Sequence, residues 1–213
     1  MDPLAIGLAL AGGVWGVAAD RIATRWPVHE EPFVAGRRAD WRTVVCGAVG
    51  AVGLGLLPER FPEGLALVAF SAFVVALVLL LATDLDQRLL PDLITLPMIP
   101  IAFAYALSGQ NPLVGGGLVP AIVAAVIIPT ALYVPSLLFG AGAFGLGDVK
   151  LLVSVGLVAG AYRALVGVAF GVLVAGIVIL GLLAARRVTL RSYVPFGPFL
   201  VLGALWSVLV RLG

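Results

Sequence analysis

The segment FVVALVLLLATDLDQ, residues 73–87, decides how this chain folds. An uncharged run from Phe73 to Thr83 is followed at once by Asp84 and Asp86. A charged side chain at membrane depth costs at least about 2.5 kcal/mol even on lenient insertion scales, so acids beside a span need a reason to be there. The run therefore predicts a membrane-spanning helix, and the acids predict a functional site at its end.

The composition of the whole chain agrees with this interpretation. Of its 213 residues, 62% are hydrophobic and 11% are charged, whereas soluble domains carry about 25% charged residues. We expect an all-α, polytopic transmembrane helical bundle that forms a single membrane domain over residues 1–213. The apolar N-terminal stretch lacks the basic region of a cleavable signal, so we expect it to be retained as the first span.

Eight segments have about the length that a helix needs to cross a bilayer. They are residues 3–19, 43–58, 63–83, 92–108, 114–139, 148–161, 163–185 and 194–212. With eight spans both termini lie on one side, and the loops on the other side carry ten of the 13 Lys and Arg residues. Positive residues prefer the cytoplasm. This bias predicts a short cytoplasmic loop at 20–42 and places all four acids of the two motifs, Asp84, Asp86, Asp92 and Asp148, at the cytoplasmic face.

The first acidic motif also offers ordinary structural roles. Asp84 has the position of an interfacial acid, and Asp86 that of a solvated loop charge. Pro91 and Asp92 are expected to open the next helix, where an acid meets the positive end of the helix dipole. We interpret Asp84 as functional and the other two acids as structural.

The second acidic motif, GLGDVK at residues 145–150, stands where a later helix begins. Gly145 and Gly147 permit positive φ and close backbone approach. The ordinary role of Asp148 is a helix N-cap. Lys150 has two interpretations, an interface anchor or a positive charge that tunes a neighbouring carboxylate.

Two carboxylates held close together share a proton, so the charged one can take a proton from water while the neutral one donates to a carbonyl oxygen. The sequence offers no other nucleophile motif. Its single Cys46 and single His29 cannot form an internal disulfide or a Cys/His zinc site, so we expect no metal. These residues favour aspartic-protease chemistry.

Three motifs resemble those of bacterial type IV prepilin peptidases. Residues 83–97 resemble the first aspartate motif, residues 145–151 match the GxGD motif shared with other intramembrane aspartyl proteases, and VPFGPF at 194–199 resembles the family's Pro-Phe-Gly-Pro-Phe stretch. They define a peptidase core at 63–212. The resemblance implies that Asp84 and Asp148 are the catalytic pair, supported by Asp86, Asp92, Gly145, Gly147 and Lys150.

The resemblance also implies a substrate and a location. The family cleaves the leader of prepilins or pseudopilins at the cytoplasmic face of the bacterial inner membrane, just before the apolar helix and usually after a glycine. We therefore expect a prepilin-like substrate and the lipid bilayer as partners, and no nucleic acid.

One departure from the family concerns a second activity. Full-length members methylate the new N-terminus with S-adenosylmethionine, and many carry an insertion with two zinc-binding Cys-x-x-Cys pairs. The 20–42 loop has no cysteine, as in short relatives that serve Tad/Flp-type pili. We expect cleavage without a cofactor, with S-adenosylmethionine needed only if methyl transfer is retained.

Two other functions remain open from the residues alone. A proton-coupled transporter would use the acids as a relay and predicts acids near mid-span. A non-catalytic assembly subunit of a pilus or secretion machine predicts no cleavage and indifference to loss of Asp148.

Overall fold

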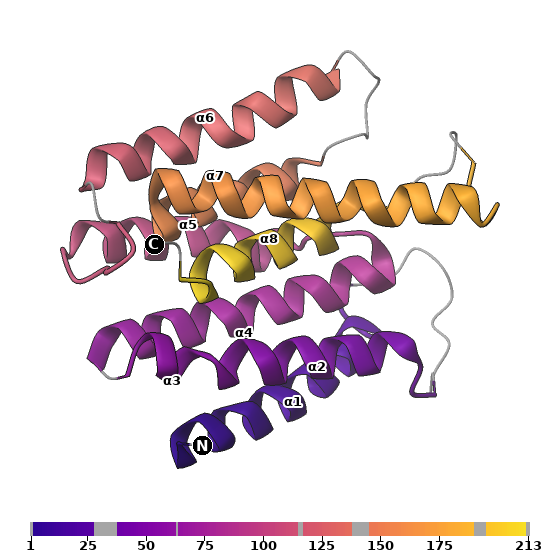
Figure 1. Ribbon diagram of the computed structural model, residues 1–213, viewed down its shortest axis with the longest axis horizontal. Coiled ribbons are helices and arrows are strands. Elements are labelled where there is room, and N and C mark those ends of the chain that lie inside the picture. Colours follow the sequence, from indigo (N-terminus) through magenta and orange to yellow (C-terminus); the bar gives the residue numbers. More distant parts are fainter. Residues whose placement is uncertain are drawn as a thin grey trace.

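The computed structural model describes residues 2–27, 38–62, 64–114, 117–137, 145–189 and 195–211, and within these ranges it contains helices and no strand. The elements are α1 (Pro3–Ala23), α2 (Trp41–Gly55), α3 (Leu57–Arg60), α4 (Gly64–Gln87), α5 (Asp92–Leu107), α6 (Leu118–Ser136), α7 (Leu146–Ala184) and α8 (Gly197–Leu209). Figure 1 shows them packed lengthwise as one bundle. The predicted all-α fold is confirmed.

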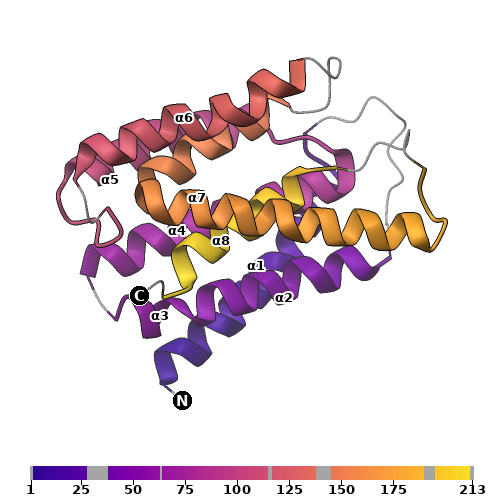
Figure 2. The same cartoon turned by 45° about the horizontal axis from the view of Figure 1, so that its top comes forward.

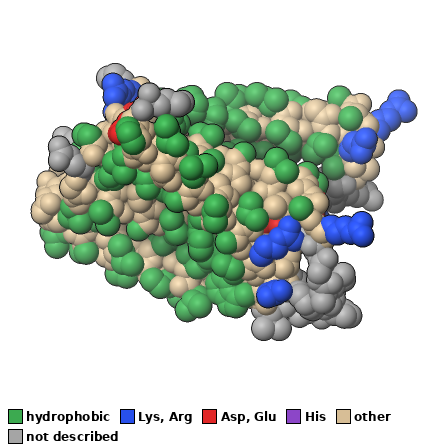
Figure 3. Space-filling view, turned by 90° about the horizontal axis from the view of Figure 1, so that it is seen from below, with side chains coloured by type: hydrophobic (Ala, Val, Ile, Leu, Met, Phe, Trp, Pro, Cys, Tyr) green, Lys and Arg blue, Asp and Glu red, His purple; other side chains and the backbone are tan. Residues whose placement is uncertain are grey.

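The surface of this bundle suits lipid rather than water. Five helical segments, Pro3–Ala23, Trp41–Arg60, Gly64–Gln87, Leu118–Ser136 and Leu146–Ala184, are long and apolar enough to cross a membrane. Large apolar side chains stand outward along them, among them Val14 at 72% exposure and Val119 at 71%. Figure 3 shows a largely apolar surface with Lys and Arg gathered toward the two ends. A continuous apolar face of this size marks a membrane-embedded protein.

The predicted count of eight separate helices is wrong. The described residues form seven long helices and the four-residue α3, because the predicted spans 148–161 and 163–185 belong to one element, α7. The backbone at Gly160, with φ 74° and ψ 173°, is not helical. Figure 2 shows α7 doubling back on itself, so its two arms run in opposite directions. Glycine suits this break because positive φ costs it little.

Close packing through small residues holds the helices together. Gly16 of α1 lies against the Cys46 backbone of α2, and Gly167 of α7 lies against Gly203 of α8, with no room for a Cβ at either glycine. Small residues of this kind let backbones approach closely in lipid, where no hydrophobic force drives helices together. The central α4 packs against α1, α2, α5 and α8, and α7 packs against α5, α6 and α8.

The order of the helices brings both acidic motifs to the same end of the bundle. Helix α4 ends there, and α5, α7 and α8 begin there. Arg88, with φ 56°, starts the reversal after α4, and Pro91 is the N-cap of α5. Two helices run past their predicted ends. Helix α4 continues to Gln87, and α1 continues to Ala23, so Asp20 is helical and not part of the predicted 20–42 loop.

Candidate active site

Both acidic motifs face one cavity of ≈ 610 Å³ at this end of the bundle. The lining combines the segment after α1, the link from α4 to α5, the start of α7 and the start of α8. Its residues are Trp26, Pro27, Asp84, Arg88, Leu89, Leu90, Pro91, Asp92, Leu93, Gly145, Leu146, Gly147, Asp148, Lys150, Phe196 and Gly197. Of the sequence-predicted site residues, only Asp86 is absent from this lining.

Asp84 is the buried acid of the site. It lies in the last turn of α4 with 5% of its surface exposed. Its Oδ2 atom is buried and has no hydrogen-bond partner among the described residues. Asp148 and Arg88 are both close enough to act on it electrostatically. A buried carboxyl oxygen left unpaired is rare in folded proteins and needs an explanation.

Asp148 is the second acid, and it is half-buried. It is the third residue of α7, and its Oδ2 accepts a hydrogen bond of 3.0 Å from the backbone N–H of Gly145. Gly145 is the N-cap of α7, so Asp148 does not fill the N-cap position that was its ordinary alternative role. The acid instead reaches back to the N-cap backbone, as in one half of a capping box. Helix geometry therefore fixes the direction of this carboxylate.

Two glycines allow the close approach that the site needs. A Cβ on Gly147 would lie 2.8 Å from the Leu90 Cβ, so this glycine lets the start of α7 touch the link between α4 and α5. A Cβ on Gly197 would lie 2.6 Å from Asp84 Oδ2, so α8 lies directly against the carboxyl group. Of the two features that Gly145 and Gly147 permit, the structure uses close approach at Gly147 and positive φ at neither, since the described glycines with positive φ are Gly64, Gly109, Gly117 and Gly160.

Asp92 and Lys150 connect the two motifs. Asp92 is the first residue of α5, as predicted, and its Oδ1 lies 2.6 Å from the Lys150 Nζ atom of α7. The side chains are 61% and 23% exposed, so the pair contributes at most about 1 kcal/mol to stability. The structure places Lys150 next to a carboxylate, that of Asp92, and both interpretations of Lys150 stay open.

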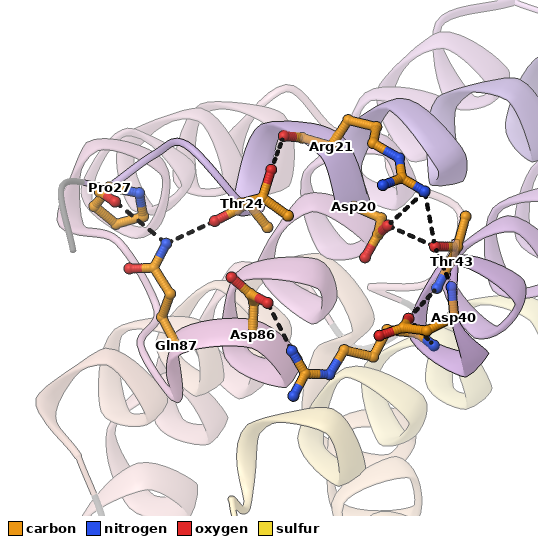
Figure 4. A network of polar contacts seen from close by, with 10 residues as sticks. Asp20, Arg21, Thr24, Pro27, Asp40, Thr43, Asp86 and Gln87 are labelled. Carbon is orange, nitrogen blue, oxygen red and sulfur yellow. Dashed lines mark hydrogen bonds and ion pairs between the residues drawn. The ribbon is translucent and has the colours of Figure 1, made fainter. Parts of the chain in front are cut away.

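Asp86 is not a solvated loop charge. Its side chain is 11% exposed and forms an ion pair of 2.6 Å with Arg42 at the start of α2. Figure 4 shows this pair beside a second contact, in which the Gln87 side chain donates to the backbone oxygens of Ala23 and Pro27 at 2.7 and 3.2 Å. The solvated interpretation failed because α4 extends past Asp86 and packs against α1 and α2.

A buried hydroxyl and carboxylate complete this network. The Thr43 hydroxyl donates to Asp20 Oδ2 at 2.7 Å, and Arg21 donates to the same hydroxyl at 3.3 Å (Figure 4). Among the described residues, no three His, Cys, Asp or Glu side chains come close enough together to hold a metal ion.

Sequence reasoning missed several lining residues. Phe196 and Gly197 belong to the VPFGPF stretch, but nothing in that stretch indicated contact with Asp84. Trp26, Pro27 and Arg88 carried no pattern that placed them at the site, because a cavity wall assembled from distant segments has no local periodicity.

Comparisons with known proteins identify a family to which this chain is similar. The type IV leader peptidase family matches residues 71–183. A prepilin leader peptidase/N-methyltransferase of Burkholderia pseudomallei (strain 1026b) is 35% identical over 158 residues, which cover 73% of this chain and 50% of that protein. Proteins with the same description from Aeromonas salmonicida (strain A449) and Aeromonas hydrophila are 31% and 30% identical over 134 residues, covering 63% of this chain and 46% of each.

The matches cover part of this chain and part of each relative. No solved structure matches the chain, and the chain spans about half the length of the curated relatives that it matches. The family match itself covers more than half of the chain and includes both Asp84 and Asp148. This chain therefore belongs to the type IV leader peptidase family.

Proposed function

We propose that this protein is an intramembrane aspartyl endopeptidase that cleaves the leader of prepilin-like proteins, with Asp84 and Asp148 as its catalytic pair. One observation carries the proposal. Two acids from separate helices line one cavity and interact electrostatically, and the more buried of them has an oxygen without a hydrogen-bond partner among the described residues. Paired carboxylates that share a proton can act as general base and general acid at once.

The surroundings of the two acids suggest which one holds the proton. The Gly145 N–H donates to Asp148, and a hydrogen bond of this kind stabilises a charged carboxylate. The Asp84 Oδ2 atom has no donor among the described residues and is shielded by α8. Asp148 is therefore the general base that takes a proton from water, and Asp84 is the general acid.

The reaction then follows the two-carboxylate scheme. Asp148 removes a proton from a water molecule in the cavity, and the water oxygen attacks the scissile carbonyl carbon. Asp84 donates its proton to the carbonyl oxygen, which gives a neutral tetrahedral intermediate. When the intermediate collapses, Asp148 gives the proton that it accepted to the leaving nitrogen and the C–N bond breaks. One hydroxyl of the intermediate returns a proton to Asp84, which gives the new carboxyl group and restores the starting state of both acids.

The end of the bundle at which the cavity lies indicates the side of cleavage. Eight described Lys and Arg residues lie toward this end, and Arg60, Arg163 and Arg211 lie toward the other. The positive-inside rule therefore supports a cytoplasmic active site in a bacterial inner membrane. A substrate would keep its basic leader in the cytoplasm and its apolar helix in the bilayer, with cleavage just before that helix.

We propose cleavage without methyl transfer. The curated relatives are described as peptidase and N-methyltransferase. Helices α1 and α2 are joined by residues 24–40, a link without cysteine that is too short for a separate cofactor-binding domain. The rival transporter function is disfavoured, because both acids lie at helix ends rather than near mid-span.

The experiment uses the purified chain in lipid nanodiscs with a synthetic prepilin leader joined to its apolar helix. Asp84→Asn and Asp148→Asn should each abolish cleavage, and the double variant should be scarcely worse, because residues that act as one unit are non-additive. Asp2→Asn is the matched control, since Asp2 is the exposed N-cap of α1 and asparagine caps equally well. Substantial cleavage by either folded single variant would refute the pair.

A further inference from the structure

An apolar groove lies between α4 and α5, on the side of these helices that leads away from the candidate active site. Residues 88–91 join the two helices, yet α5 packs closely on α7 and only loosely on α4. The groove has a volume of ≈ 170 Å³ and no charged side chain in its lining. This volume suits the side chains of a docked helix rather than the helix itself, which is about 10 Å across. Its lining includes Ala69, Ala72, Ala76, Met98, Ile101 and Tyr105.

One face of α5 connects this groove to the active-site cavity. Leu93 lines the cavity that contains both acids, and Ile101 lines the groove. Pro97 lies one helical turn from each of them, so the three residues share a face of the helix. Leu93 is 72% exposed and Ile101 is 67% exposed, and Pro97 is exposed as well. An exposed apolar strip therefore leads from the acids into the groove over about 12 Å.

The two prolines of α5 leave hydrogen-bond acceptors without donors on this part of the helix. In a regular helix the carbonyl of one residue accepts from the N–H of the fourth residue after it. Pro97 and Pro100 lie inside α5 and have no N–H. The carbonyls of Leu93 and Leu96, two exposed residues, therefore lack their usual donors within the helix. A lipid tail has no donor to offer to such a carbonyl, whereas a polypeptide does.

The substrate class of the proposed function carries matching donors. Cleavage just before an apolar helix places the start of that helix beside the acids, at the level of Leu93. The first four N–H groups of any helix have no partner within it. The carbonyls of Leu93 and Leu96 lie where these N–H groups would need acceptors. A peptide helix thus fits the strip better than a lipid does.

We propose that the groove between α4 and α5 binds the apolar helix of the prepilin-like substrate, an inference that rests on the proposed function. The substrate helix begins beside Leu93, donates to the carbonyls of Leu93 and Leu96, and follows α5 past Pro97 to Ile101. The distance of about 12 Å from Leu93 to Ile101 corresponds to about eight residues of the substrate helix. A large apolar side chain about eight residues past the scissile bond therefore enters the groove.

The first test maps the docked helix by photo-cross-linking of the full chain in lipid nanodiscs, with a synthetic prepilin leader joined to its apolar helix as the probe. Benzoylphenylalanine is placed at Ile101 or, as the matched control, at Val119, which is 71% exposed on α6. The group at 101 should attach to substrate residues about six to ten past the scissile bond, and the group at 119 to none. Equal labelling from both positions would overturn the proposal. Cross-linking does not require cleavage, so this failure is distinct from failure of the catalytic assignment.

The second test fills the groove. Ala72→Phe should raise KM about tenfold and leave kcat unchanged, which is the pattern of lost binding rather than lost chemistry. Ala169→Phe, on the exposed face of α7, is the matched control and should change neither quantity. Alanine in place of the large apolar side chains about six to ten residues past the scissile bond should remove the difference between Ala72→Phe and the wild type. A wild-type KM in folded Ala72→Phe would refute the groove.

The third test separates substrate binding from folding. Pro97→Ala and Pro100→Ala together restore the N–H donors within α5, so Tm should rise while KM increases about tenfold. A variant that simply misfolds would instead lower Tm. Pro129→Ala is the matched control, because Pro129 lies inside α6 and should leave KM unchanged. An unchanged KM in the double variant, or an equal increase in the control, contradicts docking along α5.

Discussion

The contact between α8 and Asp84 makes Gly197→Ala a sharp test of the candidate site. A Cβ at this position would lie 2.6 Å from Asp84 Oδ2, 2.7 Å from Cγ and 3.0 Å from Oδ1, whereas ordinary contacts begin at 3.4 Å. The carboxyl group or the helix must therefore move by roughly 0.8 Å. A misplacement near 1 Å at a catalytic group costs about 10²-fold in rate, and overpacking a tight site costs about 1–3 kcal/mol of stability.

The assay separates these two effects. The kcat/KM for a prepilin leader substrate should fall by about 10²-fold, while Tm in the same detergent falls by a few degrees. Two controls carry the same substitution. Gly176→Ala on α7 meets nothing within 4 Å and should leave both quantities unchanged or raise Tm. Gly203→Ala on α8 clashes with the Gly167 backbone away from the cavity, so it should lower Tm but keep kcat/KM in the folded fraction.

The reasoning is refuted if folded Gly197→Ala cleaves at the wild-type rate while Gly203→Ala loses stability as expected. In that case the position of the Asp84 carboxyl group against α8 does not affect cleavage. Gly197→Val adds a second measure, because a larger side chain must displace the carboxyl further and should lower kcat/KM beyond the alanine variant.

Four further outcomes are expected. Asp86→Asn and Asp92→Asn should keep measurable cleavage, because their contacts are structural; complete loss in Asp86→Asn alone would mean that the wrong acid was chosen. Activity should survive exhaustive chelation, and its loss to EDTA with recovery on zinc addition would contradict a two-carboxylate mechanism. Reporter fusions after Gly109 and Arg211 should read as external and one after Arg187 as cytoplasmic, with the reverse pattern excluding a cytoplasmic site. Mass spectrometry of a processed pilin should find an unmethylated N-terminus, even with S-adenosylmethionine supplied.

The fold was largely predictable because lipid restricts what a chain can do. Backbone groups in hydrocarbon must pair within a helix, so apolar length alone locates most of the spans. The break at Gly160 was harder to locate, since one positive-φ glycine leaves no trace in hydropathy and this chain has 27 glycines. The last turn of α4 was also missed. Its polar residues are typical of a loop, and the sequence does not reveal the residues of α1 and α2 that they contact.

The site was predictable only where residues carry chemistry in a local pattern. The acids stood out because charge is expensive beside a span, and their convergence was predicted from the loop charges. The contact between Gly197 and Asp84 was not predictable. A glycine has no side chain whose chemistry could indicate its neighbour, so only the structure shows that it faces the Asp84 carboxyl group. The ion pair between Asp92 and Lys150 was not predictable either. The sequence explains Asp92 as an acid at a helix N-terminus and Lys150 as an interface anchor, without any contact between them.

The part of the chain outside the family match still bears on the site. The match begins at residue 71 and so omits α1 and α2. Arg42 of α2 forms an ion pair with Asp86, and the backbone oxygen of Ala23, the last residue of α1, accepts a hydrogen bond from Gln87. Both contacts fall in the last turn of α4, which also carries Asp84. The proposed mechanism requires the Asp84 carboxyl group to be held within a fraction of an ångström, and α1 and α2 supply the contacts against which α4 ends. We therefore expect substitutions at these contacts to disturb the site more than substitutions on the lipid-facing surfaces of α1 and α2.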